Sequence, residues 1–211
     1  MSKLIGIMGL KGSGKDTVAR CTIYADGGSQ TWKKMAFADT LKDAVSDLFG
    51  WDRKLIEGDS NDSREWREKV DSYWERELNI PNFSPRKALQ LIGTEVIRDS
   101  FNKDFWVKAL KKKIINSTCH VIVTDVRFPN EYNMIKSLGG KIVQVIRGDL
   151  PEWWENAVAF NQGKCDGSLL KDIHPSEYSL AGIAEPDYII HNDDSLEKLR
   201  KECLIMMNKI F

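Results

Sequence analysis

The chain lacks the features that mark membrane, secreted and zinc-binding proteins. Its 211 residues contain no apolar run near the roughly 18 residues of a membrane span. The apolar run after the first three residues is too short and too interrupted by glycine for a signal peptide. The four cysteines lie far apart, with no Cys-x-x-Cys pair and no histidine pattern typical of zinc sites. We therefore expect a soluble cytoplasmic protein with reduced thiols.

The chain also has no net charge, since 31 Lys and Arg residues balance 31 Asp and Glu residues. Without a global basic field we expect neither nucleic-acid nor membrane binding. The lysines between Lys108 and Lys113 are accordingly interpreted as a solvated helix face. Repeats and low-complexity segments are absent too. A chain of this length suits one buried α/β core with insertions.

What the sequence does contain is a glycine-rich loop, Gly9-Leu10-Lys11-Gly12-Ser13-Gly14-Lys15-Asp16-Thr17, between an apolar run and a helical pattern. The spacing Gly9-x4-Gly14-Lys15 is that of the phosphate loop (P-loop), in which backbone N–H groups and a lysine bind nucleotide phosphates. Asp16 departs from the motif, because Ser or Thr usually stands there to hold Mg²⁺. A plain glycine turn with a solvated lysine is the alternative, but strand-loop-helix is the context that the motif requires.

Five short apolar runs alternate with helical patterns, which predicts a doubly wound parallel sheet with helices on both faces. The expected strands are residues 4–8, 32–37, 120–125, 141–147 and 187–191. We predict one P-loop domain with its core at residues 1–50, 86–147 and 187–211, an insertion at about 51–85, and a lid at about 148–186. Within the insertion, residues 62–77 are expected to form one long polar helix.

Two further groups of residues lie where such a sheet binds ligands. Asp125 ends an apolar strand and Arg127 follows it, a placement suited to a carboxylate near Mg²⁺ and a guanidinium near a transferring phosphate. A turn cap before Pro129 is the alternative for Asp125. Arg86 and Gln90 share one face of a predicted helix, with Gly93-Thr94 one turn later. That face is suited to binding a phosphate and a base, and an ordinary polar helix surface is the alternative.

These segments together resemble a known family. The P-loop ending in Gly-Lys-Asp-Thr is followed by Ser84-Pro85-Arg86-Lys87-Ala88-Leu89-Gln90-Leu91-Ile92-Gly93-Thr94-Glu95, Phe105-Trp106-Val107-Lys108, Thr124-Asp125-Val126-Arg127 and His174-x-x-Glu177. In this order they resemble the deoxynucleoside monophosphate kinases of tailed bacteriophages, which are P-loop nucleoside monophosphate (NMP) kinases. The resemblance implies transfer of the γ-phosphoryl group of ATP to a deoxynucleoside 5′-monophosphate (dNMP), in the host cytoplasm if the source is viral.

The resemblance also implies roles for individual residues. ATP phosphates and metal would be held by Lys11, Gly12, Ser13, Gly14, Lys15, Asp16 and Thr17, with Asp16 and Asp125 as the Mg²⁺ ligands and Asn192 near the ATP base. The monophosphate side would comprise Lys42, Arg64, Arg86, Gln90, Gly93, Thr94 and Trp106, with Arg127 beside the reacting phosphates. Lys15, Asp125, Arg127 and the lid-base Arg147 would be the catalytic residues.

Three questions stay open on the sequence alone. The phosphomevalonate kinases share the Gly-Lys-Asp loop and the Asp-x-Arg strand end, and a nucleotide-binding regulator would also need a phosphate nest. His174 is interpreted as a lid or surface histidine, since phosphoryl transfer to a phosphate needs no proton acceptor. Trp153-Trp154 suits either a lid contact or a subunit interface, which leaves a homodimer open.

Overall fold

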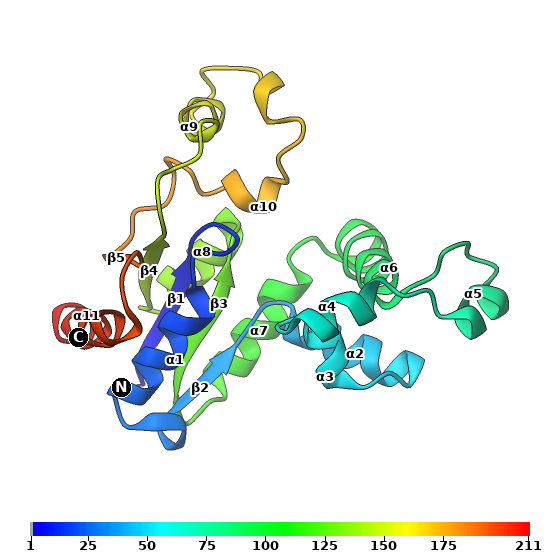
Figure 1. Cartoon of the computed structure of the whole chain (residues 1–211), viewed down its shortest axis with the longest axis horizontal. Coiled ribbons are helices and arrows are strands. Elements are labelled where there is room, and N and C mark those ends of the chain that lie inside the picture. Colours follow the sequence, from blue (N-terminus) through cyan, green and yellow to red (C-terminus); the bar gives the residue numbers. More distant parts are fainter. Residues whose placement is uncertain (1) are drawn as a thin grey trace. The chain divides into compact units, whose positions relative to one another are not determined.

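The computed structural model describes residues 2–211 and divides the chain into two compact units (Figure 1). The first comprises the N-terminal residues through Ala36 together with Lys111–Phe211, and the second is Phe37–Leu110. Each unit has its own buried apolar cluster. Among the residues described, no helix is long and apolar enough to cross a membrane.

A five-stranded parallel sheet forms the centre of the first unit, which confirms the predicted fold class. The strands are β1 (Leu4–Met8), β2 (Trp32–Met35), β3 (His120–Val126), β4 (Lys141–Ile146) and β5 (Tyr188–His191), in the order β2-β3-β1-β4-β5. The central strand β1 is buried along its whole length, as expected for a parallel strand covered on both faces. Its carboxyl end leads directly into the P-loop.

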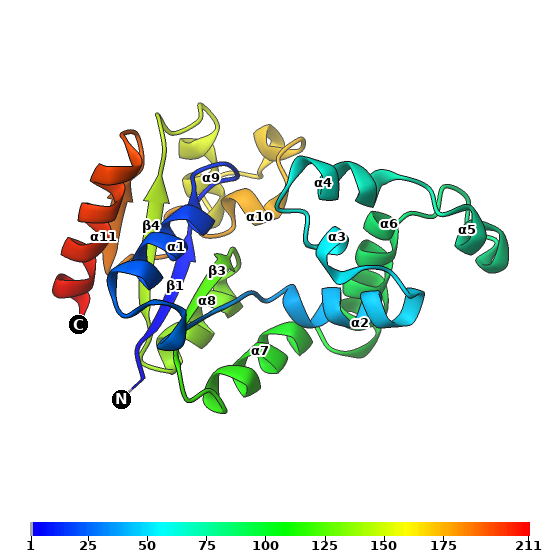
Figure 2. The same ribbon diagram turned by 60° about the horizontal axis from the view of Figure 1, so that its bottom comes forward.

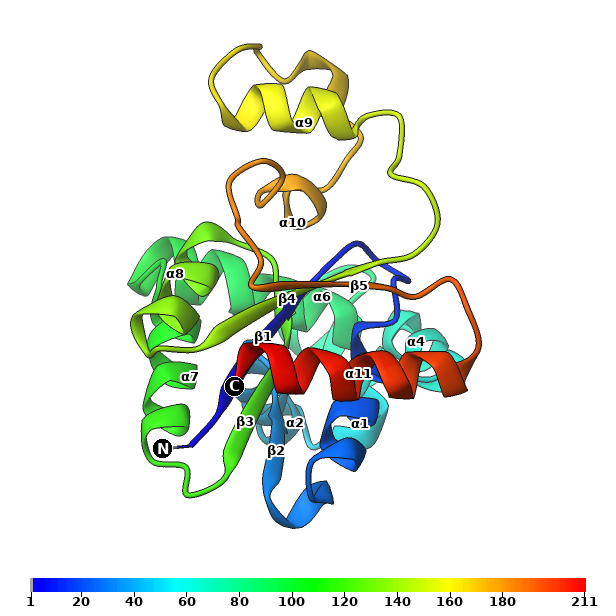
Figure 3. The same cartoon turned by 90° about the vertical axis from the view of Figure 1, so that its left-hand side faces the viewer.

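Helices cover both faces of this sheet (Figure 3). On one face, α1 (Lys15–Ala25) and α11 (Leu196–Ile210) pack against each other and on a cluster that includes Ile5 and Ile122. On the other face lies α8 (Pro129–Ser137). A Cβ atom on Gly6 of β1 would stand 3.3 Å from the Ile135 side chain of α8, so the missing side chain lets this helix approach closely.

The segment between β4 and β5, predicted as a lid, contains short helices around a small apolar cluster of its own. It comprises α9 (Trp154–Asn161), a 3₁₀ turn η3 (Ser168–Leu170) and α10 (Pro175–Tyr178). Ala157, Leu170 and Ala181 form the buried centre of the cluster, and both Trp153 and Trp154 pack against it. The tryptophan pair therefore makes a contact within the lid segment.

The second unit is helical (Figure 2). It contains α2 (Asp39–Phe49), α3 (Arg53–Glu57), α4 (Asn61–Glu68), α5 (Ser72–Leu78), α6 (Pro85–Gln90) and a π-helical continuation η2 (Leu91–Phe101), while α7 (Phe105–Ile115) crosses the division between the units. Ser84 caps α6 by accepting a hydrogen bond from the Lys87 N–H, and Pro85 occupies the first turn, where its missing N–H costs nothing.

The prediction of one long helix over residues 62–77 was wrong, because α4 and α5 are separate helices. Lys69 adopts an extended conformation, and Asp71 starts α5 by accepting hydrogen bonds from the N–H groups of Tyr73 and Trp74. The other carboxylate oxygen of Asp71 accepts from the Trp51 indole at 2.8 Å. A capping aspartate therefore ends the polar pattern that suggested a continuous helix.

The second unit also extends beyond the predicted insertion at 51–85, since it runs from Phe37 to Leu110. The apolar residues of α2 explain the difference. Val45 is fully buried beside Trp51 and Phe83, with Leu41 and Phe49 packed against the same cluster. The stripe of α2 thus belongs to the aromatic core of the insertion.

Candidate active site

The P-loop connects β1 to α1 through glycines that no other residue could replace without strain. Gly14 has φ 95° and stands at the N-cap of α1, where a Cβ atom would lie 2.2 Å from the amide nitrogen of Asn192. Gly9 is equally close to its surroundings, because a Cβ atom there would lie 2.4 Å from the Val145 carbonyl oxygen. No side chain caps α1, so the N–H groups of its first turn remain available to an anion.

Lys15 places a cation inside this loop. Its Nζ donates hydrogen bonds to the carbonyl oxygens of Gly9 and Leu10, each at 2.8 Å, and the residue is 9% exposed. Burial, together with the nearby positive charge of Arg127, lowers the pKa of Lys15 from 10.5 to about 8. The negative charge of a phosphate group at this position would offset the cost of burying the Lys15 ammonium group.

Ser13 and Asn192 complete the loop wall. The Ser13 hydroxyl is buried and has no hydrogen-bond partner among the described residues, which is a costly arrangement unless a ligand satisfies it. Asn192 donates from its side-chain amide to the Ser13 carbonyl oxygen at 2.9 Å. Asn192, which was predicted to lie near the ATP base, therefore supports the P-loop directly. The unpaired Ser13 hydroxyl is consistent with a loop that binds phosphate.

Arg127 and Asp125 come from the end of β3, as the sequence predicted. Asp125 contributes a negative charge that raises the pKa of Lys15, so the two residues act on the same site. The backbone N–H of Arg127 donates to Glu131 Oε2 at 2.8 Å, which fixes the start of the loop before α8. Arg127 and Lys15 are thus two cations at one edge of the sheet.

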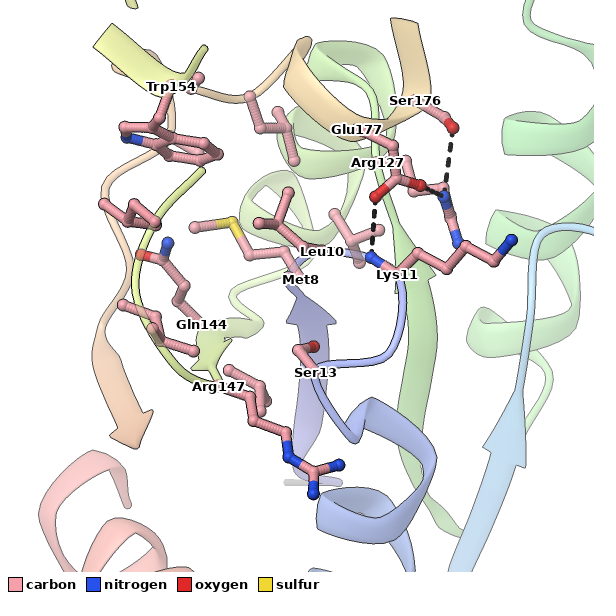
Figure 4. A pocket seen from close by; sticks show the side chains of 18 of the residues that line it. Met8, Leu10, Lys11, Ser13, Arg127, Gln144, Arg147, Trp154, Ser176 and Glu177 are labelled. Carbon is pink, nitrogen blue, oxygen red and sulfur yellow. Dashed lines mark hydrogen bonds and ion pairs between the residues drawn. The ribbon is translucent and has the colours of Figure 1, made fainter. Parts of the chain in front are cut away.

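The lid segment contacts this edge through Glu177 (Figure 4). One carboxylate oxygen of Glu177 accepts from the Lys11 backbone N–H at 2.7 Å, and the other accepts from Arg127 Nη1 at 2.6 Å. Ser176 Oγ accepts from the same Nη1 at 3.1 Å. Burial alone would raise the pKa of Glu177, but the Lys11 N–H and the Arg127 charge lower it below its usual value. Glu177 is therefore ionised near neutral pH.

A cavity of about 240 Å³ lies between the P-loop, the end of β4 and the lid segment. Trp154, Leu150 and Met8 give it apolar walls, whereas Gln144 extends into it from β4 (Figure 4). Arg147 lines the cavity too, but its guanidinium points away from the Glu177–Arg127 pair. The structure thus brings Lys15, Asp125 and Arg127 together and leaves the predicted catalytic Arg147 apart from them.

Asp16 and Thr17 follow Lys15 on the first turn of α1. Asp16 is exposed and forms an ion pair with Lys34 at 3.0 Å, and Thr17 accepts a long hydrogen bond from Arg20 at 3.5 Å. In the described residues no three His, Cys, Asp or Glu side chains gather as a metal cluster. Mg²⁺ in phosphotransferases is bound by one or two carboxylates together with substrate phosphates and water. Asp16 and Asp125, both near Lys15, fit that smaller requirement.

The predicted substrate residues Lys42 and Arg64 lie in the second unit, where acidic and backbone groups hold them. Lys42 Nζ pairs with Glu57 Oε1 at 2.9 Å, and Arg53 pairs with the other oxygen of Glu57 at 2.6 Å. Burial would raise the pKa of Glu57, but these two cations lower it from 4.5 to about 2. Arg64 Nε donates to the Gly58 carbonyl oxygen at 3.1 Å.

Arg86 projects from the first turn of α6 and is largely exposed. Its Nε lies 3.3 Å from Glu68 Oε1, a pair that solvent weakens. Burial lowers the pKa of nearby Arg67, as does the charge of Arg86, and the Arg67 Nε is buried without a hydrogen-bond partner in the described residues. The second unit thus gathers guanidinium groups that an anionic ligand could bridge.

Gln90 and Thr94 are exposed, whereas Gly93 and Trp106 are buried. The Trp106 indole N–H donates to the Gly93 carbonyl oxygen at 2.9 Å. A substituent at Gly93 would stand 2.5 Å from Leu41. Trp106, which the resemblance placed on the monophosphate side, therefore supports the backbone of η2 from inside, and its buried indole presents no open face to a ligand. Its indole N–H is bonded to the π-helix η2, and π-helical turns are often found at functional sites.

Sequence reasoning gave no role to Glu177, Ser176, Glu131 or Arg67. The signal for Glu177 was present, because it belongs to the His174-x-x-Glu177 motif, although the motif did not say what the carboxylate contacts. Its partners Lys11 and Arg127 are 166 and 50 residues away along the chain. Glu131 and Arg67 carried no signal, since an acid after Pro129 and an arginine in a charged helix are both ordinary.

Comparisons with known proteins give consistent findings. A family model described as deoxynucleotide monophosphate kinase matches residues 57–203. A putative deoxynucleotide monophosphate kinase of Acanthamoeba polyphaga mimivirus is 31% identical, over 95% of this chain and 94% of its own. A deoxynucleoside-5′-monophosphate kinase of Escherichia phage T5 is 25% identical, over 96% of this chain and 94% of its own.

The solved structures that resemble this chain have TM-scores below 0.5. A dephospho-CoA kinase from Campylobacter jejuni has a TM-score of 0.45 and 17% identity, covering 99% of this chain and 97% of its own. A shikimate kinase from Aquifex aeolicus has a TM-score of 0.43 and 15% identity, covering 97% of this chain and 96% of its own. Neither similarity bears on the activity of this chain.

Proposed function

This chain belongs to the deoxynucleotide monophosphate kinase family, and from that premise we propose that it transfers the γ-phosphoryl group of ATP to a dNMP. The products are ADP and the deoxynucleoside diphosphate. The observation that carries the proposal is the nest around Lys15, where a desolvated lysine, Arg127 and an orphaned serine hydroxyl surround an anion-binding loop. Phosphoryl transfer requires such a cradle and little covalent chemistry from the protein.

The ATP side of the reaction is assigned to the first unit. Lys11, Gly12, Ser13, Gly14, Lys15 and Thr17 would bind the phosphates, and Asn192 would lie near the base. Lys15 is suited to this role because its ammonium group is bonded to two carbonyl oxygens of its own loop, which a phosphate can replace. Arg147, at the base of the lid segment, would contact ATP from the side of its sugar or base.

The dNMP side is assigned to the second unit. Arg86, Arg64 and Lys42 would bind the acceptor phosphate, with the weak Arg86–Glu68 pair the easiest to exchange for a phosphate. The exposed Gln90 and Thr94 would contact the nucleoside. Gly93 and Trp106 would act indirectly, since the Trp106 indole fixes the Gly93 carbonyl.

Mg²⁺ would be held by Asp16 and Asp125 together with the ATP phosphates, which accords with the small number of protein ligands that this ion uses. When bound, the ion would neutralise charge on the transferring group. For this purpose Asp16 must exchange its exposed ion pair with Lys34, which costs little. The aspartate at a position where P-loops usually carry a hydroxyl would supply charge as well as an oxygen ligand.

In the mechanism that we propose, an oxygen of the dNMP phosphate attacks the γ-phosphorus in line. The new P–O bond forms as the bond to the β-phosphate oxygen breaks, and ADP leaves with the electron pair. That acceptor oxygen is already ionised, so no general base is needed, which is consistent with an exposed His174 whose ring bonds to Ser176. Lys15 and Arg127 would stabilise the charge that spreads over the transferring group.

The direct test is the release of ADP from ATP and Mg²⁺ with each of the four dNMPs, accompanied by identification of the products. We expect at least one dNMP to stimulate ADP release and to appear as its diphosphate. Phosphomevalonate, the acceptor of the alternative kinase family, should give no stimulation. If no deoxynucleotide stimulates ADP release, the proposed function is excluded.

A further inference from the structure

A carboxylate from the lid segment lies on the anion-binding loop of this chain. Glu177 belongs to α10, yet it accepts hydrogen bonds from the Lys11 N–H of the P-loop and from the Arg127 guanidinium at the end of β3 (Figure 4). A single side chain therefore joins three segments of the first unit: the P-loop, the end of β3 and the lid segment.

This position is electrostatically unfavourable for a protein that binds ATP. The Glu177 side chain is only 19% exposed, and its negative charge acts on Lys15 in the same nest that the ATP phosphates should enter. At such short range a carboxylate repels phosphate. If Glu177 only tethered the lid segment, a neutral side chain would do so without this repulsion.

In return, Glu177 fixes the position of the Arg127 guanidinium. The backbone N–H of that arginine is held by Glu131, whereas among residues 2–211 its guanidinium is held by the lid segment, through Glu177 at 2.6 Å and Ser176 Oγ at 3.1 Å. An arginine side chain loses considerable conformational entropy when it is fixed. A charge-assisted hydrogen bond from the guanidinium to a half-buried carboxylate can offset that loss before the substrates arrive.

We propose that Glu177 is a positioning residue, which holds the Arg127 guanidinium and the P-loop backbone in the arrangement required for phosphoryl transfer. The inference rests on the proposed function. Glu177 raises the turnover rate through Arg127 and, by its charge, weakens ATP binding in the ground state. The two effects have opposite signs, and a merely structural carboxylate would not produce both.

Glu177→Gln tests the proposal, because it keeps the size of the side chain and removes the charge. We expect kcat to fall by roughly 10-fold or more, since charge-stabilising groups commonly contribute 10² to 10³ to the rate and a misplaced arginine retains part of this effect. The KM for ATP and the Kd of ATP measured by calorimetry should both decrease, because the repelling charge is gone. Glu155→Gln, an exposed acid on α9 of the same lid segment, is the matched control and should change neither.

A double-mutant cycle with Arg127→Met asks whether Glu177 acts through that arginine. In the Arg127→Met background, Glu177→Gln should cause little further loss of kcat, because the positioned group is already missing. Glu177→Asp should recover part of the lost rate. Ser176→Ala, which keeps the carboxylate and removes the weaker contact, should cause a smaller loss and remains informative if Glu177→Gln folds poorly.

An unchanged kcat in a folded Glu177→Gln variant would overturn the inference, as would additive losses in the cycle or ATP binding by the variant that is no tighter than that of the wild type. These outcomes differ from failure of the proposed function, in which the wild-type chain itself would phosphorylate no dNMP. In that case the ATP-binding comparison still judges the charge effect, and binding by the variant that is no tighter than that of the wild type still overturns the inference.

Discussion

The two units of this chain present positive charge in different ways. Around the P-loop the cation is buried, since Lys15 is bonded to carbonyl oxygens of its own loop and its pKa is lowered to about 8. In the second unit Lys42 is paired with Glu57, and the largely exposed Arg86 is paired with Glu68. The first arrangement is set by the backbone, whereas the second consists of side chains that can exchange partners.

The difference has a physical consequence for binding. A desolvated lysine without a carboxylate partner is unfavourable until an anion arrives, so the P-loop gains interaction energy directly when phosphate binds. Cations that already have carboxylate partners must first give them up, and exposed pairs of this kind are worth little. We infer that the ATP site is preorganised and that the acceptor site rearranges on binding.

The largest effect is expected from Lys15→Met. It removes the one cation that is enclosed by the loop, and kcat/KM for ATP should fall by about 10² or more. Stability should not fall in the same variant, because burying the lysine charge is costly in the ligand-free chain. Steady-state kinetics and thermal unfolding measure the two quantities. Lys201→Met, which removes a surface ion pair on α11, should leave the kinetics unchanged.

Lys15 also predicts a pH dependence. The free chain must hold this lysine protonated to bind phosphate, so kcat/KM for ATP should decline as pH rises through about 8. The bound phosphates raise the lysine pKa again, and kcat should therefore stay flat over the same range. A decline that appears equally in kcat, or that persists in Lys15→Met, would contradict the assignment.

A smaller and more selective effect is expected from Arg86→Met. Loss of a charge-assisted contact to the acceptor phosphate should raise the KM for the dNMP by about 10-fold to 100-fold, with little change in the KM for ATP. Arg76→Met is the matched control, since Arg76 is an exposed arginine of the same unit whose pair with Glu77 is 71% and 48% exposed. Equal changes in both KM values would mean that Arg86 is not specific to the acceptor.

The smallest effect is on stability. Glu57 pairs with Lys42 and Arg53, and removing its charge in Glu57→Gln should lower the free energy of unfolding by about 1 kcal/mol at pH 7, because the side chains remain partly exposed. Because the pKa of Glu57 falls from 4.5 to about 2 on folding, this contribution is fully present above pH 4.5 and is lost as pH falls toward 2.

Urea unfolding of both proteins at several pH values checks the sign. The difference between wild type and Glu57→Gln should shrink as the pH is lowered from 4.5. Glu77→Gln, which breaks an exposed pair in the same unit, should differ little from wild type at any pH. A difference for Glu57→Gln that is constant down to pH 2 would show that its charge is not the cause.

Much of the fold could be predicted from the sequence because its signals are local. The buried strands are continuous apolar runs, and the glycine spacing of the P-loop demands the strand-loop-helix context in which the structure places it. The start of α6 followed from Ser84 and Pro85. The break between α4 and α5 was missed because Asp71 reads as one more acid in a polar helix until its contact with Trp51 is known.

In the candidate site, too, some residues could be predicted from local motifs and others depend on tertiary contacts. Lys15 and Ser13 follow from a motif, and the structure brings Asp125 and Arg127 to the same edge because parallel strands end there. The role of Trp106 could not be predicted, because its burial depends on packing of η2 against α2 and α7. The contact of Glu177 with Lys11 depends on how the lid segment folds back, which no local pattern encodes.

If the proposed function holds, one chain binds ATP at the P-loop unit and a dNMP at the helical unit in a single reaction. Calorimetry with a bisubstrate analogue, in which adenosine and the accepted deoxynucleoside are joined through an oligophosphate, tests it most directly. We predict that the analogue binds roughly 10²-fold or more tightly than either half, because the second half binds at a high effective concentration. An affinity no better than that of the tighter half would contradict the account.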